Sequence, residues 1–251
     1  MQPEDYIFGL RPIIEAIQAD SEIDKVFIKK DLGGELASEL LSLLREHNIP
    51  VQRVPVERLN RITRKNHQGA VAMLSAVTYY SLENLIPQLY EEGRLPFVIV
   101  LDGITDVRNF GAIARTAECT GADAIVIAQR GSVSVGGDAV KTSAGALMHI
   151  PICRERNLAG AVRYLRDNGY STVAVSEKAT ENYTQVDFTG PVALVMGAED
   201  VGISPSVMAQ CNTRVAIPMF GQIGSLNVSV AAGVIMYEVV RQRLDANLEV
   251  I

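Results

Sequence analysis

Three segments of the chain place glycines and polar side chains directly after runs of apolar residues. Their sequences are LDGITDVRNFGAIARTAECTGA (101–122), VALVMGAEDVGIS (192–204) and IPMFGQIGSLNVSVAAGVIMYEVVRQR (217–243). Glycines permit a close backbone approach, and free N–H groups beside the end of a strand can receive a ligand. Because the apolar runs are predicted strands, the three segments lie where the ligand site of an α/β domain is expected.

Arg115 is the candidate for chemistry in the first segment. A helix predicted over 111–120 has Ile113, Ala114 and Ala117 on its apolar face, which leaves Arg115 at a different angle. In the first turns of that helix an arginine lies near the positive end of the macrodipole and gains nothing from its field. This position favours a cation kept for a ligand or a partner, and the alternative is an exposed, solubilising arginine.

The other two segments offer Glu199, Ser225 and Asn227. Glu199 stands between Gly197 and Gly202, where its carboxylate would bind a cation or substrate, or cap the following turn. Ser225 or Asn227 would cap the long apolar helix that follows. The loop GQIGS before them is longer than capping requires, and this excess indicates a pocket.

The motifs of several other catalytic and ligand-binding classes are absent from the sequence. No Walker A pattern is present, because Gly136 is followed by Gly137 and Lys141 stands too far on. No GxGxxG follows the apolar run at 97–102, and no GxSxG nucleophile elbow occurs. No metal-ligand spacing joins the three histidines, His47, His67 and His149. We therefore expect neither a phosphate-loop enzyme nor a bound metal.

The composition is that of a cytoplasmic globular protein with enough apolar residues for a packed core. Of 251 residues, 48% are hydrophobic and 21% are charged, and the length favours a small domain plus a larger one. No stretch approaches the roughly 20 apolar residues that span a bilayer, and the N-terminus lacks a signal-peptide layout. The cysteines form no CxxC pair, and we expect all three to be small core residues in a reducing compartment: Cys119, Cys153 and Cys211.

The formal charge of −6 argues mildly against nucleic-acid binding, because neutralising phosphates requires lysine and arginine. Segment 52–68 departs from this balance, since it carries a single acid, Glu57, against five cations: Arg53, Arg58, Arg61, Arg64 and Lys65. Two interpretations of this segment stay open. It either contacts RNA phosphates or is a solvated helix face.

The first part of the chain is predicted to alternate short helices and strands. Helices are expected over 11–19 and 35–47, strands over 25–29 and 51–54, and an apolar run at 70–77 ends the module. Such alternation favours an α/β sandwich over residues 1–77. The next stretch, 78–96, has mixed polarity, two prolines and a glycine, and is predicted to be a linker that holds one short helix.

From residue 97 onward the pattern becomes that of a larger α/β domain, 97–251. Five near-continuous apolar runs are typical of a parallel sheet covered on both faces: FVIVLD, AIVIA, TVAVS, VALVMG and RVAIP. Helices are predicted between and after them at 111–120, 158–168 and 228–243. Ligands in such folds gather at the carboxyl ends of the strands.

The three segments resemble the three sequence motifs of the SpoU methyltransferases, in their expected order. The resemblance rests on Asn109 with Arg115, on the glycines and Glu199 of MGAEDVGIS, and on IPMFGQIGSLNVSVAAGVIMYE. It implies a SPOUT-superfamily catalytic domain folded as a deep trefoil knot, in which the C-terminal segment threads a loop to form the cofactor pocket. It also implies a homodimer with the active site near the dimer interface.

The N-terminal segments YIFGLRPIIEAI (6–17) and HQGAVAM (67–73) resemble the RNA substrate-binding domain of bacterial enzymes that methylate a guanosine ribose in 23S rRNA. That domain is a small α/β module related to a ribosomal-protein fold of the L30e-like type. Arg11 stands where this pattern often has histidine. The resemblance therefore favours rRNA over tRNA as the substrate.

The function implied by this resemblance is transfer of a methyl group from S-adenosyl-L-methionine (SAM) to a ribose 2′-hydroxyl of RNA. The catalytic positions would be Arg115, at the ribose or adjacent phosphate, with four polar residues that orient it and the substrate: Asn109, Glu199, Ser225 and Asn227. The cofactor positions would be Gly197, Ile217 and Leu226, through their main chain, with Met196 and Met219 beside them.

Two other classes of protein compete with this interpretation. An RNA-binding or ribosome-assembly protein without catalysis would keep the N-terminal module, but it would not need the GQIGSLN and MGAEDVG loops. A nucleotide-dependent oxidoreductase or kinase would need the phosphate loops that are missing. Within the favoured chemistry, methylation of a tRNA ribose stays the alternative to rRNA.

Overall fold

A computed structural model describes residues 6–247, which divide into two compact units. The first unit contains the described residues up to Thr78 together with the short segment Ser134–Asp138. The second contains Tyr79–Val133 and the chain from Ala139 onward. The ends of the two predicted domains, 1–5 and 248–251, lie outside the described residues. None of the helices in the described part has the length and apolarity needed to cross a membrane.

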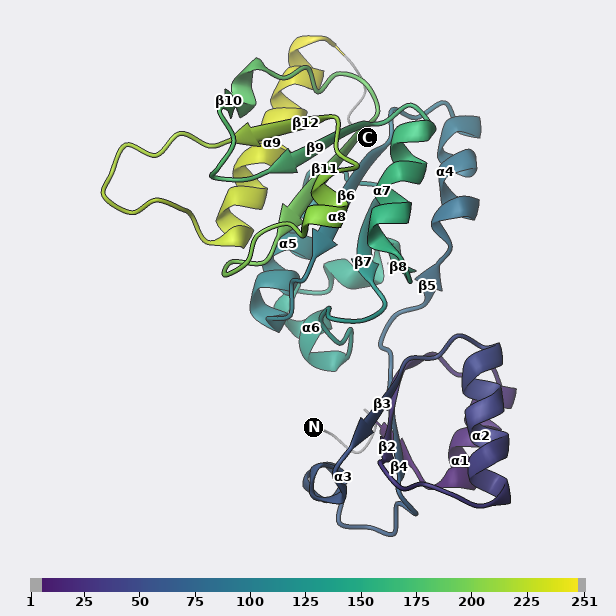
Figure 1. Ribbon diagram of the computed structural model, residues 1–251. Coiled ribbons are helices and arrows are strands. Elements are labelled where there is room, and N and C mark those ends of the chain that lie inside the picture. Colours follow the sequence, from purple (N-terminus) through teal and green to yellow (C-terminus); the bar gives the residue numbers. More distant parts are fainter. Residues whose placement is uncertain (1–5, 248–251) are drawn as a thin grey trace. The chain divides into compact units, whose positions relative to one another are not determined.

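The first unit is a four-stranded sheet with helices on both faces (Figure 1). Its strand order is β1-β4-β2-β3, and β2 and β3 are parallel while the other neighbours are antiparallel. The elements are β1 Tyr6–Phe8, α1 Leu10–Gln18, β2 Ile23–Lys29, α2 Glu35–Glu46, β3 Val51–Val54, α3 Val56–Ile62 and β4 Ala70–Leu74.

Side-chain alternation along the central strands explains why both faces of this sheet are covered. Val26 and Ile28 of β2 point to the face that α1 and α2 bury, whereas Phe27 between them packs with Leu59 of α3 on the other face. The predicted helices and strands of this part agree with the observed ones to within two residues at each end, apart from the run 70–77, in which only Ala70–Leu74 is a strand.

The second unit is built on an eight-stranded, wholly parallel sheet. The strand order is β10-β12-β9-β11-β6-β7-β8-β5. The strands are β5 Tyr79–Tyr80, β6 Phe97–Asp102, β7 Ala124–Ala128, β8 Ile152–Glu155, β9 Ser171–Val175, β10 Glu181–Asn182, β11 Val192–Gly197 and β12 Thr213–Ala216. The expected α/β class with a parallel sheet is therefore present.

Helices cover both faces of this sheet, as its continuous apolar strands require (Figure 1). One face packs against α4, α7 and α8, while α5 and α9 pack against each other and α9 contacts β11. The helices of this unit are α4 Leu82–Glu91, α5 Val107–Cys119, α7 Leu158–Asp167, α8 Pro205–Met208 and α9 Val228–Asp245, with 3-10 turns η1 Ala146–Met148 and η2 Tyr183–Gln185. Helix α6, Gly137–Thr142, begins in the short segment of the first unit and continues into the second.

The segment 78–96, predicted as a linker that holds one short helix, contains that helix as α4, but from Tyr79 onward it belongs to the second unit. Tyr79 and Tyr80 form β5, the edge strand beside β8, and α4 packs into the core through Leu82, Ile86 and Leu89. Spacings of four and three residues place these apolar side chains on one face of the helix. The mixed polarity of the segment reflects an amphipathic surface helix rather than an exposed connection.

Candidate functional site

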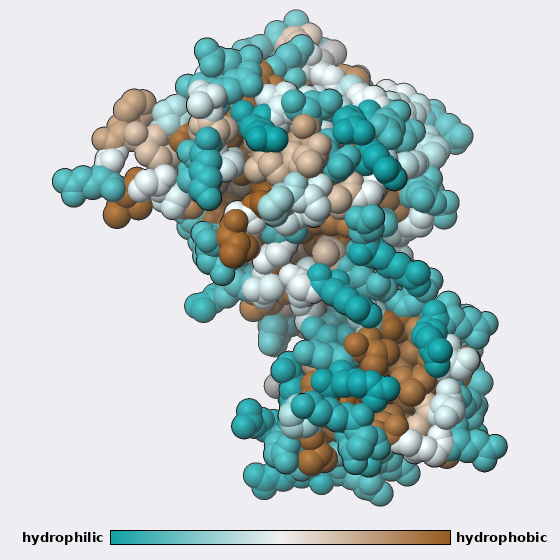
Figure 2. Space-filling view, in the orientation of Figure 1, coloured by the Kyte–Doolittle hydropathy of each residue, from teal (hydrophilic) through white to brown (hydrophobic). Residues whose placement is uncertain are grey.

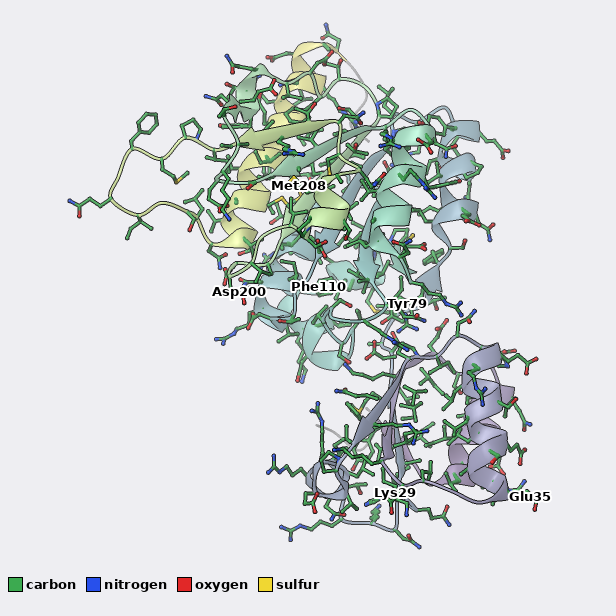
Figure 3. The ribbon with its side chains drawn as sticks, viewed as in Figure 1. Lys29, Glu35, Tyr79, Phe110, Asp200 and Met208 are labelled. Carbon is green, nitrogen blue, oxygen red and sulfur yellow. The ribbon has the colours of Figure 1, made fainter. Side chains whose placement is uncertain are left out.

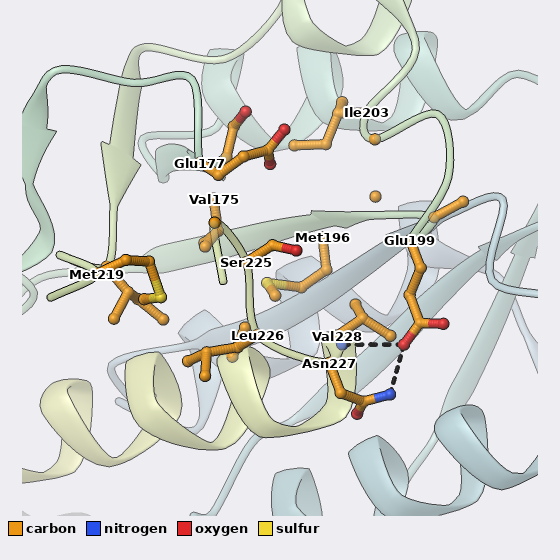
Figure 4. Close-up of a pocket in the computed structure, with 17 residues that line it drawn as sticks. Val175, Glu177, Met196, Glu199, Ile203, Met219, Ser225, Leu226, Asn227 and Val228 are labelled. Carbon is orange, nitrogen blue, oxygen red and sulfur yellow. Dashed lines mark hydrogen bonds between the residues drawn. The ribbon is translucent and has the colours of Figure 1, made fainter. Parts of the chain in front are cut away.

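A cavity of about 520 Å³ lies at the carboxyl ends of β9, β11 and β12. Figure 4 shows that its walls come from the loops that follow these strands and from the start of α9. Its volume falls within the range of sites for small molecules and cofactors. The lining residues are Val175, Ser176, Glu177, Met196, Gly197, Ala198, Glu199, Gly202, Ile203, Ile217, Met219, Gly224, Ser225, Leu226, Asn227, Val228 and Ala231.

The five residues predicted to hold the cofactor all line this cavity: Met196, Gly197, Ile217, Met219 and Leu226. They come from two of the motif segments, which are far apart in sequence. The segments meet because β11 lies next to β9, and β9 next to β12. The parallel strands thus bring the loops at their carboxyl ends to one edge of the sheet.

Gly197 permits the tight turn that forms one wall of the cavity. A Cβ atom at this position would lie 2.2 Å from the backbone carbon of Gly202 and from the backbone nitrogen of Ile203. The turn is closed by a hydrogen bond from the N–H of Gly202 to the carbonyl of Ala198, 2.8 Å long, and it carries the exposed Asp200 (Figure 3). Only glycine fits here without moving main chain.

A carboxylate at the end of β6 anchors the far side of the same turn. The N–H of Ser204 donates to Oδ2 of Asp102 at 2.7 Å. Asp102 is paired with Gly197 in the register of β6 and β11. The first motif segment therefore supports the second through a hydrogen bond as well as through the sheet.

Three of the predicted catalytic residues form one hydrogen-bonded cluster. The side-chain amide of Asn227 donates to Oδ1 of Asn109 at 3.0 Å and also to the carboxylate of Glu199. The same carboxylate accepts the N–H of Val228 at 3.3 Å. Asn227 caps α9 as well, because its Oδ1 accepts the N–H of Ser229 at 3.0 Å. Glu199 therefore supports the start of α9 instead of capping the turn that follows it.

The other predicted catalytic residues, Ser225 and Arg115, differ in their placement. Ser225 lines the cavity on the loop before α9. Arg115 is exposed, lies outside the lining, and within residues 6–247 its side chain has no hydrogen bond or ion pair. Asn109 of the polar cluster and Arg115 share helix α5, but in a single chain the guanidinium of Arg115 does not line the cavity.

The position of Arg115 in its helix corrects the prediction made from the sequence. Helix α5 begins at Val107, four residues earlier than expected, because Oδ1 of Asp106 accepts the N–H groups of Arg108 and Asn109, each at 2.9 Å. These hydrogen bonds hold the pKa of the Asp106 carboxyl below its usual value. Arg115 thus lies in the third turn, so the argument from the positive end of the macrodipole does not apply to it.

The lining of the cavity carries an unusual balance of charge. It contains two carboxylates, Glu177 and Glu199, and in the described part of the chain no lysine, arginine or histidine lines it. A phosphate-bearing cofactor would meet repulsion there, whereas a ligand with net positive charge would be attracted. The remaining lining is mostly backbone and apolar side chains, which suit a flat aromatic group.

One wall of the cavity was not anticipated from the sequence. Val175, Ser176 and Glu177 lie at the end of β9 and beyond it. The signal was present, because polar residues follow the apolar run TVAVS at a strand end, yet the segment lacks the glycines that marked the other loops. The order of the strands, which is a tertiary property, decides that this loop joins the site.

Gly111, in the first motif segment, is required for packing and not for ligand contact. A Cβ atom there would lie 2.6 Å from Cβ of Thr142 and 2.9 Å from the backbone nitrogen of Ser143. Helix α5 therefore packs directly on the backbone that leads into η1. This close approach holds Asn109, two residues earlier, at the polar cluster.

The basic residues of segment 52–68 are all exposed on the first unit. None of them forms an ion pair with a carboxylate among residues 6–247. The guanidinium of Arg58 lies 5.0 Å from the ring centroid of Phe27, and the ammonium of Lys65 lies 5.7 Å from that of Phe8. Arg53 donates to the carbonyl of Lys30 at 2.9 Å. Their positive charge is therefore available to a partner.

The prediction that all three cysteines are core residues is wrong for Cys119. Cys153 is buried, and burial raises the pKa of its thiol to about 12. Cys211 is partly buried, with its pKa raised to about 11 chiefly by desolvation. Cys119 is exposed because the buried face of α5 contains Ala114 and Ala117, while Cys119 falls on the opposite side.

Two sequence families match this chain in adjoining regions. The family described as SpoU rRNA Methylase matches residues 96–237, and the family described as RNA 2′-O ribose methyltransferase substrate binding matches residues 6–80. YacO of Bacillus subtilis, assigned to the TrmH family of tRNA/rRNA methyltransferases, is 35% identical over 242 residues, or 96% of this chain and 97% of YacO.

Solved structures show the same likeness. An rRNA methyltransferase of Sinorhizobium meliloti with AdoMet bound is 25% identical, matches with a TM-score of 0.60, and the match covers 94% of this chain and 87% of that one. The TrmH/SpoU tRNA modifying enzyme of A. aeolicus is 27% identical with a TM-score of 0.56, over 65% of this chain and 86% of its own. These findings confirm the resemblance seen in the motifs: the chain belongs to the SpoU methylase family and is an RNA methyltransferase that uses S-adenosylmethionine.

Proposed function

We propose that the protein transfers the methyl group of SAM to a ribose 2′-hydroxyl, on a guanosine of large-subunit (23S) rRNA. The observation that carries the proposal is the cavity whose lining, among residues 6–247, has two carboxylates and no cation. Two of its lining residues, Glu199 and Asn227, are hydrogen-bonded to each other, and Asn227 also donates to Asn109. SAM has a sulfonium and an ammonium against a single carboxylate, so it is a net cation. Its charge and its adenine both suit this lining.

The glycine and apolar positions of the cavity would hold the cofactor. Main-chain groups of Gly197, Ile217 and Leu226 supply donors and acceptors whatever their side chains are. Met196 and Met219 supply adaptable apolar contacts. Bound there, SAM provides a methyl group that its sulfonium has already activated for transfer.

The polar residues would align the ribose and help the hydroxyl to lose its proton. A 2′-hydroxyl is a poor nucleophile at neutral pH, so positioning it in line with the methyl group is the main task. We assign this task to Asn109, Glu199, Ser225 and Asn227. Arg115 would contact the ribose or the adjacent phosphate and stabilise the oxygen as its negative charge develops. A guanidinium stays protonated, so it acts as a donor and not as a base.

The exposed position of Arg115 supports a site completed by a second copy of the chain. Val230, Tyr237 and Leu244 stand at seven-residue intervals on one face of α9 and are 52%, 55% and 59% exposed. The loop before α9 adds Phe220 and Ile223, which are 97% and 77% exposed, and Figure 2 shows apolar side chains on this projecting loop. We infer that these surfaces form a homodimer in which Arg115 serves the partner's cavity.

Two mixed variants test this arrangement. Arg115→Ala and Asn227→Ala, each inactive alone, should regain activity when co-refolded, since a mixed dimer holds one intact site. Recovery only to the summed activity of the separate variants would show that Arg115 acts within its own chain. Sedimentation of Tyr237→Lys, which places a charge on the exposed face of α9, should give a monomer.

The proposal also covers two features of the fold, a knot in the second unit and the type of the first unit. The loop 217–227 and α9 come after β12, on the far side of β9 from β11, yet α9 contacts β11. This return supports a C-terminal segment that completes a deep trefoil knot. The first unit, with its sheet between α1, α2 and α3, would be the L30e-like RNA-binding domain.

The unpaired cations of the first unit would contact RNA phosphates. Their exposure, and the rings of Phe8 and Phe27 beneath two of them, favour an interaction surface over a merely solvated helix. Ribosomal RNA is favoured over tRNA because the likeness to the rRNA methyltransferase extends over 94% of this chain, including the first unit, whereas the tRNA modifying enzyme matches 65%.

The test of the proposed substrate is methyl transfer from labelled SAM to total RNA of a strain that lacks this gene. We expect one labelled position in large-subunit rRNA, and no label in RNA from the parent strain, where that position is already methylated. Label in tRNA would keep the chemistry and overturn the substrate. Absence of transfer to any RNA, including precursor ribosomal particles, would overturn the proposal.

A further inference from the structure

Glu177 is a carboxylate of the cavity to which the proposed catalytic step assigns no role. It follows β9 and lies on a turn closed by the N–H of Ala179 donating to the carbonyl of Ser176 at 3.1 Å. The N–H of Ser176 donates to the carbonyl of Val215 at 2.9 Å, which joins the turn to β12. The backbone beneath Glu177 is therefore held in place, and its side chain lines the cavity.

The two carboxylates of the cavity differ in their partners. Glu199 accepts hydrogen bonds from Asn227 and from the N–H of Val228. Glu177 has neither a hydrogen bond nor an ion pair with any other residue of the range 6–247, and its side chain is exposed to the cavity and solvent. A carboxylate without a partner in the described chain, fixed at the wall of a ligand cavity, is an acceptor left for the ligand.

The place of Glu177 in the cavity indicates which part of the cofactor it meets. Figure 4 shows Glu177 across the cavity from the Asn227–Glu199 pair and next to Val175, on the side of Met219. Under the proposed function, the sulfonium must lie near the polar pair, where the RNA hydroxyl arrives. The adenine would then pack against the apolar side chains, and the ribose that joins adenine to sulfonium would lie beside Glu177.

We propose that Glu177 recognises the cofactor by accepting hydrogen bonds from the 2′- and 3′-hydroxyls of the SAM ribose. This inference rests on the proposed use of the cavity for SAM. A carboxylate can accept both hydroxyls at once, and an acidic residue at the carboxyl end of a strand performs this task in dinucleotide-binding folds. Glu177 is a cofactor-recognition residue, and it takes no part in proton transfer.

The experiment compares Glu177→Ala and Glu177→Gln with wild type by calorimetric titration of two ligands. One ligand is SAM, and the other is 5′-methylthioadenosine, which keeps adenine and ribose but lacks the amino-acid end. Glu177→Ala should raise the Kd of both ligands by about tenfold or more, the loss expected for a charge-assisted hydrogen bond, and Glu177→Gln should raise it less. Glu181→Ala, at an exposed glutamate of β10 outside the lining, is the matched control and should change neither Kd.

Methyl transfer supplies a second readout. In Glu177→Ala the KM for SAM should rise while kcat at saturating SAM stays near the wild-type value, because the lost contact is made equally before and during the reaction. An unchanged Kd for both ligands would refute the inference. A raised Kd for SAM alone would place Glu177 at the ammonium of the amino-acid end and would also overturn it. If wild type binds neither ligand, the proposed function itself fails.

Discussion

Replacing Gly197 by alanine should disrupt the cavity without adding any charge or polar group. The new Cβ would lie 2.2 Å from backbone atoms of Gly202 and Ile203 and 2.6 Å from the carbonyl oxygen of Gly202. No flexible side chain is available to yield, so the turn 198–202 must open. Opening would break the 2.8 Å hydrogen bond between Gly202 and Ala198.

The size of the effect follows from these two losses. Forcing a methyl group into packed main chain costs about 1–3 kcal/mol, and a broken hydrogen bond adds about 1 kcal/mol. The free energy of unfolding should therefore fall by about 2–4 kcal/mol, which corresponds to a decrease in Tm of about 5–15 °C for a domain of this size. Because Gly197 lines the cavity, the Kd for SAM should rise as well.

Gly224→Ala is the matched control, since it makes the same substitution in the same cavity. Among residues 6–247, no heavy atom beyond Gly224 and its two chain neighbours lies within 4 Å of a Cβ placed at Gly224, which also lines the cavity. Thermal unfolding of both variants should show a Tm close to wild type for Gly224→Ala and a clear decrease for Gly197→Ala. Equal Tm values for the two variants would refute the reasoning that the loss of stability comes from the close approach of the new Cβ to the main chain and not from the loss of a glycine.

Three further predictions concern Arg115, the exposed cations of the first unit and the cysteines. Arg115→Ala should lower the rate of methyl transfer at least about a hundredfold, as loss of a charge-stabilising donor does. Its Kd for RNA in a filter-binding assay should stay within about twofold of wild type, and a normal rate of transfer would remove Arg115 from the mechanism. Arg58→Gln combined with Lys65→Gln should lower the slope of log Kd for RNA against log salt concentration by about 1.5, since each phosphate contact releases close to one counterion. An unchanged slope would show that these cations are solvated and do not contact phosphates. A thiol reagent at pH 8 should modify the exposed Cys119 quickly and leave Cys153 unmodified until the protein unfolds, because burial raises the pKa of the Cys153 thiol to about 12. Equal rates of modification at the two cysteines would contradict the burial of Cys153 in β8.

The central strands were predictable because burial on both faces leaves a distinctive pattern. The runs at 97–102, 124–128 and 192–197 coincide with β6, β7 and β11 to the residue. The edge strands β5 and β10 contain two residues each, too few for any alternation to appear. These two strands form because they pair with β8 and β12, which are distant in the sequence. The local sequence of β5 and β10 therefore does not predict them.

The start of α5 shows where periodicity fails. Val107, the first apolar residue after Asp106, is followed by two polar residues, Arg108 and Asn109. The amphipathic pattern of the helix therefore becomes visible only near Phe110. The cap at Asp106 determines the real beginning of the helix. Recognising Asp106 as an N-cap would have placed Arg115 in the third turn from the start.

The site was partly predictable for a related reason. Glycine-rich loops after apolar strands marked Gly197 and the residues before α9, because glycine permits the close backbone approach that a ligand site needs. The wall that contains Glu177 has no such mark, and it joins the cavity through the order of strands β12, β9 and β11. Strand order is set by packing of the whole sheet, so no motif could reveal it.

The most direct test of the central claim is alkaline hydrolysis of RNA labelled by this protein with methyl-labelled SAM. A methyl group on a ribose 2′-oxygen blocks cleavage of the adjoining phosphodiester, so the label should be recovered in alkali-resistant dinucleotides. Label recovered in single nucleotides would place the methyl group on a base, and it would contradict the proposed transfer to a ribose hydroxyl.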